Sequence, residues 1–189
     1  DAFARMAMLL FVCLRGNIIL WQGEELGLTQ VDIAFEDLQD PEAIANWPLT
    51  LSRDGTRTPM PWKAEAPNCG FSSQTPWLPL GGDHVALAVD KQEESEHSML
   101  QATRRFIALR QANEALRSGD IHIVDAQGPI LAFERKSEHQ TILCLFNMGG
   151  QSVHWTPDNL EQWRTIEQLN ATGDWKIGPY GALVAERVI

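Results

Sequence analysis

The stretch that decides the fold is residues 16–27, Gly-Asn-Ile-Ile-Leu-Trp-Gln-Gly-Glu-Glu-Leu-Gly. Its continuous apolar run is typical of a parallel strand that is covered on both faces. The apolar residues before it recur at helical spacing, so we expect a helix over residues 1–15, with Asp1 as its cap and Gly16 at its end. A helix, a tight turn and a buried strand form one unit of an α/β fold.

A long segment without periodicity follows this strand. Residues 22–89 are rich in Pro, Gly, Asp and Trp, and they are much longer than an ordinary connection. In α/β barrels the loops after the strands build the active site. We therefore expect the functional residues in this segment, and a second helix after it, over residues 95–116, closed by Gly119.

The last part of the chain has strand character. Short apolar runs alternate there with turn-forming Gly, Ser and Asn, which indicates a small antiparallel sandwich or barrel. We place a domain boundary at this change, with one domain over residues 1–118 and the other over residues 119–189. The expected strands cover residues 120–125, 130–135, 141–147, 152–155 and 182–188.

Composition excludes several classes of partner. The 189 residues carry a formal net charge of −10, which disfavours nucleic acid and anionic membrane surfaces. The longest near-apolar run, residues 6–14, is shorter than the about 20 residues that a membrane helix needs. No signal peptide is apparent at the start, and the absence of an initiator Met fits a fragment of a longer protein.

Cysteine and histidine usage points away from metals and disulfides. Cys13, Cys69 and Cys144 form an odd set without a CxxC motif, so we expect a reducing, cytoplasmic location. The five histidines, His84 among them, lack the spacing of metal ligands, and we expect them to be surface or half-buried side chains. No metal or cofactor is expected.

Two motifs carry a resemblance to a known family. Residues 16–27 resemble the last barrel strand and following loop of the α-amylase family of glycosidases (glycoside hydrolase family 13). Residues 53–62, Arg-Asp-Gly-Thr-Arg-Thr-Pro-Met-Pro-Trp, resemble a signature of its α-glucosidase and oligo-1,6-glucosidase branch. Further matches occur in the expected order, so the resemblance covers essentially the whole chain. These matches lie at residues 35–41, 47–48, 70–72, 76–79, 104–106, 109–110, 115–117, 131–133 and 145–147.

The resemblance implies a fold and an enzyme class. The chain would hold the last helix-strand-helix part of a (β/α)8 barrel, followed by a small antiparallel β-sandwich domain. The family consists of retaining glycosidases, in which one carboxylate attacks the sugar and a second protonates the leaving oxygen, while a third assists. The last of these carboxylates belongs to an Asn-His-Asp motif that is absent from this sequence. No catalytic residue is therefore assigned, and the chain alone is expected to be inactive.

The implied activity is hydrolysis of terminal, non-reducing α-linked glucose from oligosaccharides. One alternative is a sucrose isomerase or a glucosyltransferase relative, which shares these motifs. Another is a non-catalytic relative, such as the ectodomain of an amino-acid transporter subunit. A free-standing sandwich module for protein contacts is a third reading, which the long loop disfavours.

Arg57 is the main candidate for substrate binding. It matches the family Arg that helps to hold the terminal glucose, and a rigid fork of donors suits that task. The alternative interpretation is a salt bridge with Asp54 or Asp37 that staples the loop.

Four other residues are possible pocket or loop residues. Glu24 and Glu25 are adjacent and point to opposite sides, so they cannot easily converge as a catalytic pair. Glu25 is expected to accept hydrogen bonds from loop backbone N–H groups or from a basic side chain. Gln22 lies where the strand meets the pocket, and Arg53 and Asp54 are expected to shape the loop. Four tryptophans could stack on sugars, although hydrophobic anchoring is the favoured interpretation for each. They are Trp21, Trp47, Trp62 and Trp77.

A lone fragment of this kind has an exposed surface. The strand at residues 17–22 would lie between neighbours in a closed barrel, so its unpaired edges would be open. We therefore hypothesise that the chain self-associates, or that it survives as part of a nicked larger protein.

Overall fold

The structure is a computed structural model that describes residues 2–50 and 52–188. The chain forms two compact units, one made of Asp1–Ile19 with Ala102–Ile189 and the other of Leu20–Gln101. In this division the first helix belongs with the C-terminal strands. The expected boundary between residues 118 and 119 stays a prediction.

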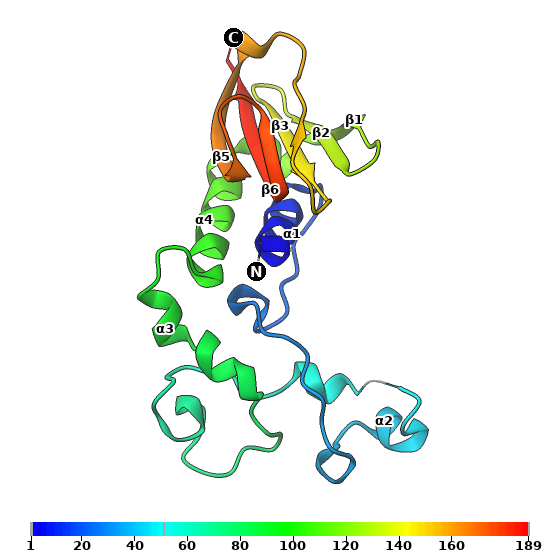
Figure 1. Cartoon of the computed structure of the whole chain (residues 1–189), viewed down its shortest axis with the longest axis vertical. Helices are drawn as coiled ribbons and strands as arrows, with labels where there is room; N and C mark the ends of the chain where they lie inside the picture. Colours follow the sequence, from blue (N-terminus) through cyan, green and yellow to red (C-terminus); the bar gives the residue numbers. More distant parts are fainter. Residues whose placement is uncertain (1, 51, 189) are drawn as a thin grey trace. The chain divides into compact units, whose positions relative to one another are not determined.

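Helix α1 spans Ala2–Cys13, as expected. It buries Met6, Leu9 and Val12 completely, and in Figure 1 it lies beside strand β6. The chain leaves the helix at Gly16, which has a φ of 107°. Glycine adopts such a positive φ at little cost in free energy. The proposed cap, Asp1, lies outside the described residues.

The expected strand at residues 17–21 is not formed, which corrects the prediction. These residues have no regular secondary structure, and Ile19 is 88% exposed. A strand exists only through hydrogen bonds to its neighbours, and the described part of the chain holds no parallel strand beside this segment. The local sequence is that of a barrel strand, but its partners decide whether it becomes one.

The expected helix at residues 95–116 is two helices. Helix α4 spans Met99–Ala112 and α5 spans Glu114–Ser118. Asn113 separates them because it is extended, and its side chain donates to Leu109 O at 2.7 Å and accepts from Gln140 Nε2 at 2.8 Å. Gly119 ends α5 as predicted, with its N–H bonded to Ala115 O at 3.0 Å. None of the described helices is both long and apolar enough to cross a bilayer.

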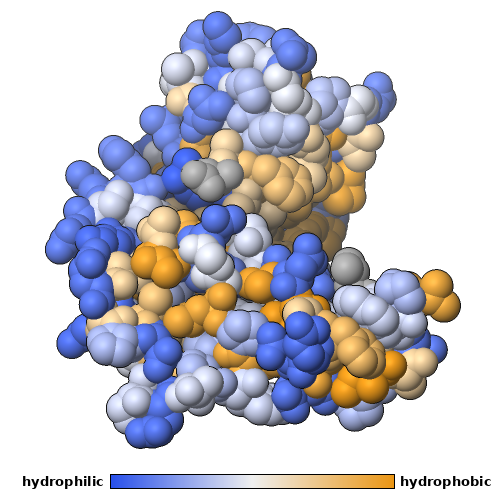
Figure 2. Space-filling model, turned by 60° about the horizontal axis from the view of Figure 1, so that its bottom comes forward, coloured by the Kyte–Doolittle hydropathy of each residue, from blue (hydrophilic) through white to orange (hydrophobic). Residues whose placement is uncertain are grey.

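The unit Leu20–Gln101 is built from short helices and loops, as the lack of periodicity predicts. A small apolar core of Ile33, Leu38, Ala43 and Leu78 holds part of it together. Several large side chains stay on its surface, including Trp77 at 68% exposure, and Figure 2 shows hydrophobic residues at the molecular surface among hydrophilic ones. Its elements are η1 (Glu24–Leu26), η2 (Phe35–Asp37), α2 (Pro41–Asn46), η3 (Arg53–Thr56), η4 (Pro67–Gly70), η5 (Gly82–Leu87) and α3 (Val89–Glu93).

The C-terminal residues form one curled antiparallel sheet. The long strand β6 is its centre, and it pairs with β3, β4 and β5 along different parts of its length. Strand β1 pairs with β2, and β2 with β3. The strands are β1 (Asp120–Asp125), β2 (Ile130–Lys136), β3 (Thr141–Asn147), β4 (Val153–His154), β5 (Trp163–Ala171) and β6 (Lys176–Arg187), with the short helix η6 (Leu160–Gln162) before β5.

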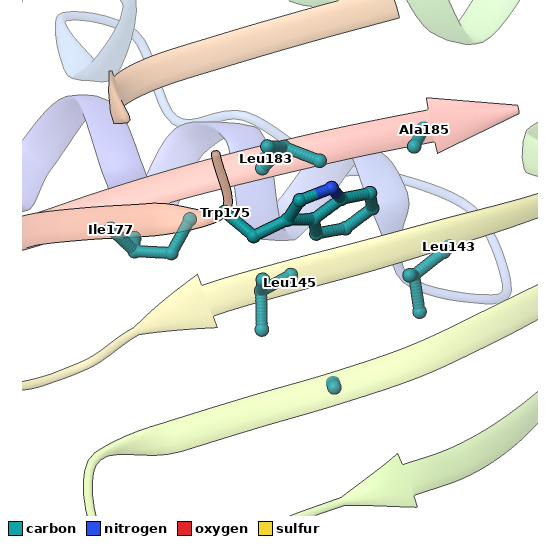
Figure 3. Packing of buried hydrophobic residues seen from close by; sticks show 7 residues of the cluster. Leu143, Leu145, Trp175, Ile177, Leu183 and Ala185 are labelled. Carbon is teal, nitrogen blue, oxygen red and sulfur yellow. The ribbon is translucent and has the colours of Figure 1, made fainter. Parts of the chain in front are cut away.

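Both faces of the sheet are covered at its centre, on strands β3 and β6. On one face Trp175 packs against Leu145 and Leu183 (Figure 3). The alternate residues of β3 and β6 point the other way, toward α1, which contacts both strands. This two-sided burial explains why β3 is apolar at almost every position rather than at every second one.

Strand β5 was missed in the sequence. Its register with β6 shifts between Thr165 and Glu167 and again between Leu169 and Ala171. Each irregularity interrupts the alternation of apolar and polar residues on which the recognition of a strand depends. The N-terminal half of β6 was missed as well, because Gly178, Pro179 and Gly181 resemble a turn.

Two arginines bind the C-terminal end of helix α1. Arg135 on β2 donates Nη1 to Cys13 O at 2.5 Å and to Leu14 O at 2.9 Å, and Nη2 to Gly119 O at 2.8 Å. Arg110 on α4 donates to Val12 O, Leu14 O and Gly16 O at 2.5–2.9 Å. Burial lowers the pKa of Arg135, so these carbonyl acceptors are what makes the buried charge tolerable.

We expect Arg135→Met to destabilise the chain by about 2–4 kcal/mol, because three buried carbonyl groups lose a charged donor. Urea or thermal unfolding would measure the change. The matched control is Arg164→Met, since Arg164 is an exposed arginine on β5 that pairs with Glu186, and surface pairs contribute about 0–1 kcal/mol. Equal unfolding free energies for the two variants would contradict the role assigned to Arg135.

Candidate functional site

A cavity of about 240 Å³ lies within the unit Leu20–Gln101. It forms where the segment that follows residue 20 meets the segment that carries the Arg-Asp-Gly-Thr-Arg-Thr-Pro motif. One wall is made by residues 21–24 and 28–30. The other wall is made by Gly55, Thr56, Thr58, Met60 and His84.

Trp21 joins the two walls. Its indole Nε1 donates to Thr56 O at 2.8 Å, a bond that spans 35 residues of sequence. The ring is half exposed, so it anchors the loop with its polar edge while part of its surface faces the cavity.

A close backbone approach joins the walls a second time. Val31 N donates to Gly55 O at 3.0 Å. A Cβ atom on Gly55 would lie 2.2 Å from Val31 O, so only glycine allows the two segments to come this near. Gly55 is therefore a structural requirement of the motif.

Glu24 and Glu25 fold the first wall. Glu25 Oε2 accepts from Gly23 N at 2.8 Å, and Glu24 Oε2 accepts from Trp21 N at 2.9 Å. Both carboxylates therefore bind backbone N–H groups of their own turn, which is the arrangement expected of Glu25 as a loop acceptor. They do not converge on a common point as a catalytic pair would.

Asp54 organises the loop from a fully buried position. Its Oδ2 accepts from the backbone N–H groups of Gln39 and Asp40, each at 2.7 Å. Ser52 Oγ accepts from Asp54 N at 2.9 Å and caps the short helix η3. The interpretation of Asp54 as a residue that shapes the loop agrees with these contacts.

Arg53 binds Asp40, a partner that was not predicted. Arg53 Nε donates to Asp40 Oδ2 at 2.8 Å, its Nη2 donates to Oδ1, and its backbone N–H donates to Oδ2 at 3.1 Å. Asp40 also caps helix α2 through Glu42 N at 3.3 Å. The sequence signal that could have identified Asp40 is the Asp-Pro pair at 40–41, which is typical of a helix start.

The Arg53 side chain holds the pKa of Asp40 well below its ordinary value of 3.8. A carboxyl group whose pKa is lower in the folded state stabilises that state above its unfolded pKa. The stabilisation is lost as the pH falls from about 4 toward the folded pKa. This part of the loop therefore keeps its ion pair across the neutral and mildly acidic range.

Arg57 lies next to the cavity, between two residues that line it, Thr56 and Thr58. Its Nη1 is 4.0 Å from Asp54 Oδ1, and its side chain is 36% exposed. Asp54 Oδ1 is buried and has no hydrogen-bond partner, so the carboxylate attracts the guanidinium without a close bidentate contact. Among the residues that the structure describes, most of the N–H donors of Arg57 therefore have no hydrogen-bond acceptor.

Gln22 and His84 both line the cavity. The prediction for the histidines is wrong at His84, which is buried with 1% exposure. Its Nε2 lies 2.9 Å from Thr29 O, so Nε2 is assigned the proton, and Nδ1 is a buried acceptor without a partner. No spacing signal links residues 29 and 84, so only the folded chain reveals this contact.

The chain is similar to a known family and to known proteins. The model of the α-amylase catalytic domain matches residues 1–119. A probable α-glucosidase of Rhizobium meliloti (strain 1021) is 45% identical over 81% of this chain and 28% of its own length. A probable oligo-1,6-glucosidase 2 of Bacillus subtilis (strain 168) is 27% identical over 84% of this chain and 32% of its own length.

Solved structures give the same family. The chain superimposes on an α-glucosyl transfer enzyme, XgtA, with a TM-score of 0.89 and 41% identity, over 98% of this chain and 36% of that one. A trehalulose synthase, MutB, has a TM-score of 0.83 at 21% identity, which shows the fold alone. The chain spans about a third of the length of these relatives. The match to the family model over residues 1–119 and the 45% identity to a probable α-glucosidase show that the chain belongs to the α-amylase family.

Proposed function

We propose that this chain is part of a retaining α-glucosidase that hydrolyses terminal, non-reducing α-linked glucose from oligosaccharides. The observation that carries the proposal is the placement of Arg57, which is oriented by the buried Asp54 beside a cavity that the family motif builds. The 45% identity to a probable α-glucosidase supports the substrate class.

The chemistry needs groups that the cavity walls do not supply. A retaining glycosidase uses two carboxyl groups about 5–5.5 Å apart. Among the described residues that line the cavity, Glu24 is the one carboxylate, and it is held by the Trp21 N–H group. We therefore propose that a longer protein provides the nucleophile and the acid, and that this chain provides one side of the pocket.

Arg57 would position the substrate and would take no part in breaking the glycosidic bond. Its fork of donors can grip adjacent hydroxyl groups of the terminal glucose, or a carboxylate that binds them, and fix the sugar ring relative to the attacking group. The half-exposed guanidinium and its incomplete pairing leave donors free for this task. The three free, buried thiols support our proposal of a reducing, cytoplasmic location.

Glucosyl transfer is the second candidate. The 41%-identical structure is named an α-glucosyl transfer enzyme, and transfer differs from hydrolysis in the acceptor that attacks the glycosyl-enzyme: a sugar hydroxyl in place of water. The pocket wall described here would serve either reaction. The trehalulose synthase MutB is similar in fold alone, so it lends less support to isomerisation as the activity.

We expect the complete protein to release glucose from maltose, and the 189-residue chain to release none, because binding groups without a nucleophile or acid break no bond. Chromatography of the products from maltose and from sucrose would measure both. Oligosaccharides longer than the substrate would favour transfer, and an isomer of sucrose would favour isomerisation. Turnover of nitrophenyl α-glucoside by the chain alone would contradict the placement of the catalytic groups.

In the complete protein, we expect Arg57→Ala to lower kcat/KM by about 10²-fold, the effect of misplacing the substrate by about 1 Å, with a small change in Tm. The matched control is Arg53→Ala, which removes the bonds to Asp40 and should lower Tm more than kcat/KM. If Arg57→Ala lowered Tm and left kcat/KM intact, Arg57 would be a loop staple.

We propose that the isolated chain self-associates through its exposed apolar residues. Ile19 is 88% exposed, and Phe3 and Phe11 are about half exposed, which is costly in water. Light scattering should give a mass above that of one chain, and Ile19→Glu should lower it, while Gln127→Glu on an exposed turn should not. A monodisperse monomer would refute self-association.

A further inference from the structure

A second cavity, of about 380 Å³, lies in the β-sheet unit. It opens where the end of β1 and the segment after β4 meet the start of β5 and the end of β6. Ligand pockets usually measure about 300–1,000 Å³, so this one suits a mono- or disaccharide-sized molecule. It is separate from the cavity that Trp21 and Thr56 line.

Two tryptophans form its apolar surface. Trp155 and Trp163 are half-buried, and both pack against the core cluster that contains Leu143. Trp155 Nε1 donates to Asp125 Oδ2 at 2.9 Å, which fixes the orientation of that ring. Both rings pack against the core and also line the cavity. The Arg187 guanidinium lies over the Trp163 ring, so Trp155 offers the aromatic surface that is open to a ligand.

A charged pair stands beside the rings. Arg187 Nη2 donates to Glu134 Oε1 at 3.2 Å, and its Cζ lies 4.7 Å from the centre of the Trp163 ring. Arg187 Nε is buried and has no hydrogen-bond partner. Lys136 Nζ binds the other oxygen of Glu134 at 2.9 Å. The guanidinium is thus held in place from two sides while keeping an unused donor.

The charge balance selects the class of ligand. Three carboxylates, on Asp125, Glu134 and Asp158, line the cavity with the single guanidinium of Arg187. This balance disfavours an anion. A wholly apolar ligand would cover these charged groups without bonding to them, which is costly. A neutral molecule with an apolar face and several hydroxyl groups fits both the rings and the charges.

We propose that this cavity is a second carbohydrate-binding site, in which a pyranose ring lies against the indole of Trp155, next to the Trp163 ring that Arg187 covers. Its C–H face packs on the aromatic surface, and its hydroxyl groups exchange hydrogen bonds with Glu134, Asp125 and Arg187. The site binds sugar without cleaving it. Such binding would keep a glucan chain near the enzyme, and it does not depend on the activity proposed above.

Titration of the ¹⁵N-labelled chain with maltotriose tests the proposal, because NMR resolves the indole N–H signals of individual tryptophans. We expect the Trp155 and Trp163 signals to shift together, with a Kd on the order of 1 mM for a shallow, partly wet site. We expect no such shift with inorganic phosphate. The proposal would be overturned if only the Trp21 signal shifted, or if no tryptophan signal shifted at sugar concentrations well above about 1 mM. A shift with phosphate but not with maltotriose would also overturn it.

Matched variants locate the binding. Trp155→Ala should weaken it roughly tenfold or more by removing a stacking surface, and Trp155→Phe, which keeps an aromatic ring, should weaken it less. Trp77→Ala, at an exposed tryptophan of the other unit, and Arg57→Ala should leave it unchanged. Loss of binding in Arg57→Ala but not in Trp155→Ala would place the sugar in the first cavity and refute the second site. If the second site were refuted while the complete protein still hydrolysed maltose, the proposed function would stand without it.

Discussion

The hydrogen bonds from Arg110 and Arg135 to the end of helix α1 are the constraint on which the β-sheet unit depends. A helix leaves its last four carbonyl groups without partners inside the helix, and that end carries partial negative charge. Two guanidinium groups, one from α4 and one from β2, bond to these carbonyls. Since each arginine comes from a different element, the bonds join α1, α4 and the sheet into one unit, although the family match ends at residue 119.

In the unit Leu20–Gln101, negatively charged side chains hold the backbone in place. It has a small apolar core, so packing alone holds little of its length. Carboxylates of Asp54, Asp40, Glu24 and Glu25 instead accept hydrogen bonds from backbone N–H groups. Such charge-assisted bonds are stronger than neutral ones, and the fixed backbone in turn places the Arg57 side chain. Acidic residues that resemble catalytic groups in the sequence are therefore largely engaged in shaping the wall.

Hydrophobic periodicity and turn residues predicted those helices and strands that depend mainly on neighbouring residues in the sequence. Helix α1, the stop at Gly119 and most of the strands follow from periodicity and turn residues. The strand at residues 17–21 failed because its existence depends on neighbours, and β5 was missed because two irregularities break its alternation. At the site, Arg57 and Gln22 were named through a motif, and their role in substrate binding stays a prediction. The contacts Arg53–Asp40 and His84–Thr29 join residues whose spacing carries no signal, so the sequence could not predict them.

The two cavities differ in how their walls are held, and this difference bears on what each can do. The walls near Trp21 rest on hydrogen bonds and on the close approach at Gly55, so their shape depends on hydrogen bonds within a loop rather than on a packed core. The walls near Trp155 are rings packed on a buried core, so little conformational entropy is lost when a ligand binds. A preorganised surface suits steady attachment of substrate. A loop-built wall suits a pocket that must close around a sugar and release its product, because loop contacts open at low cost.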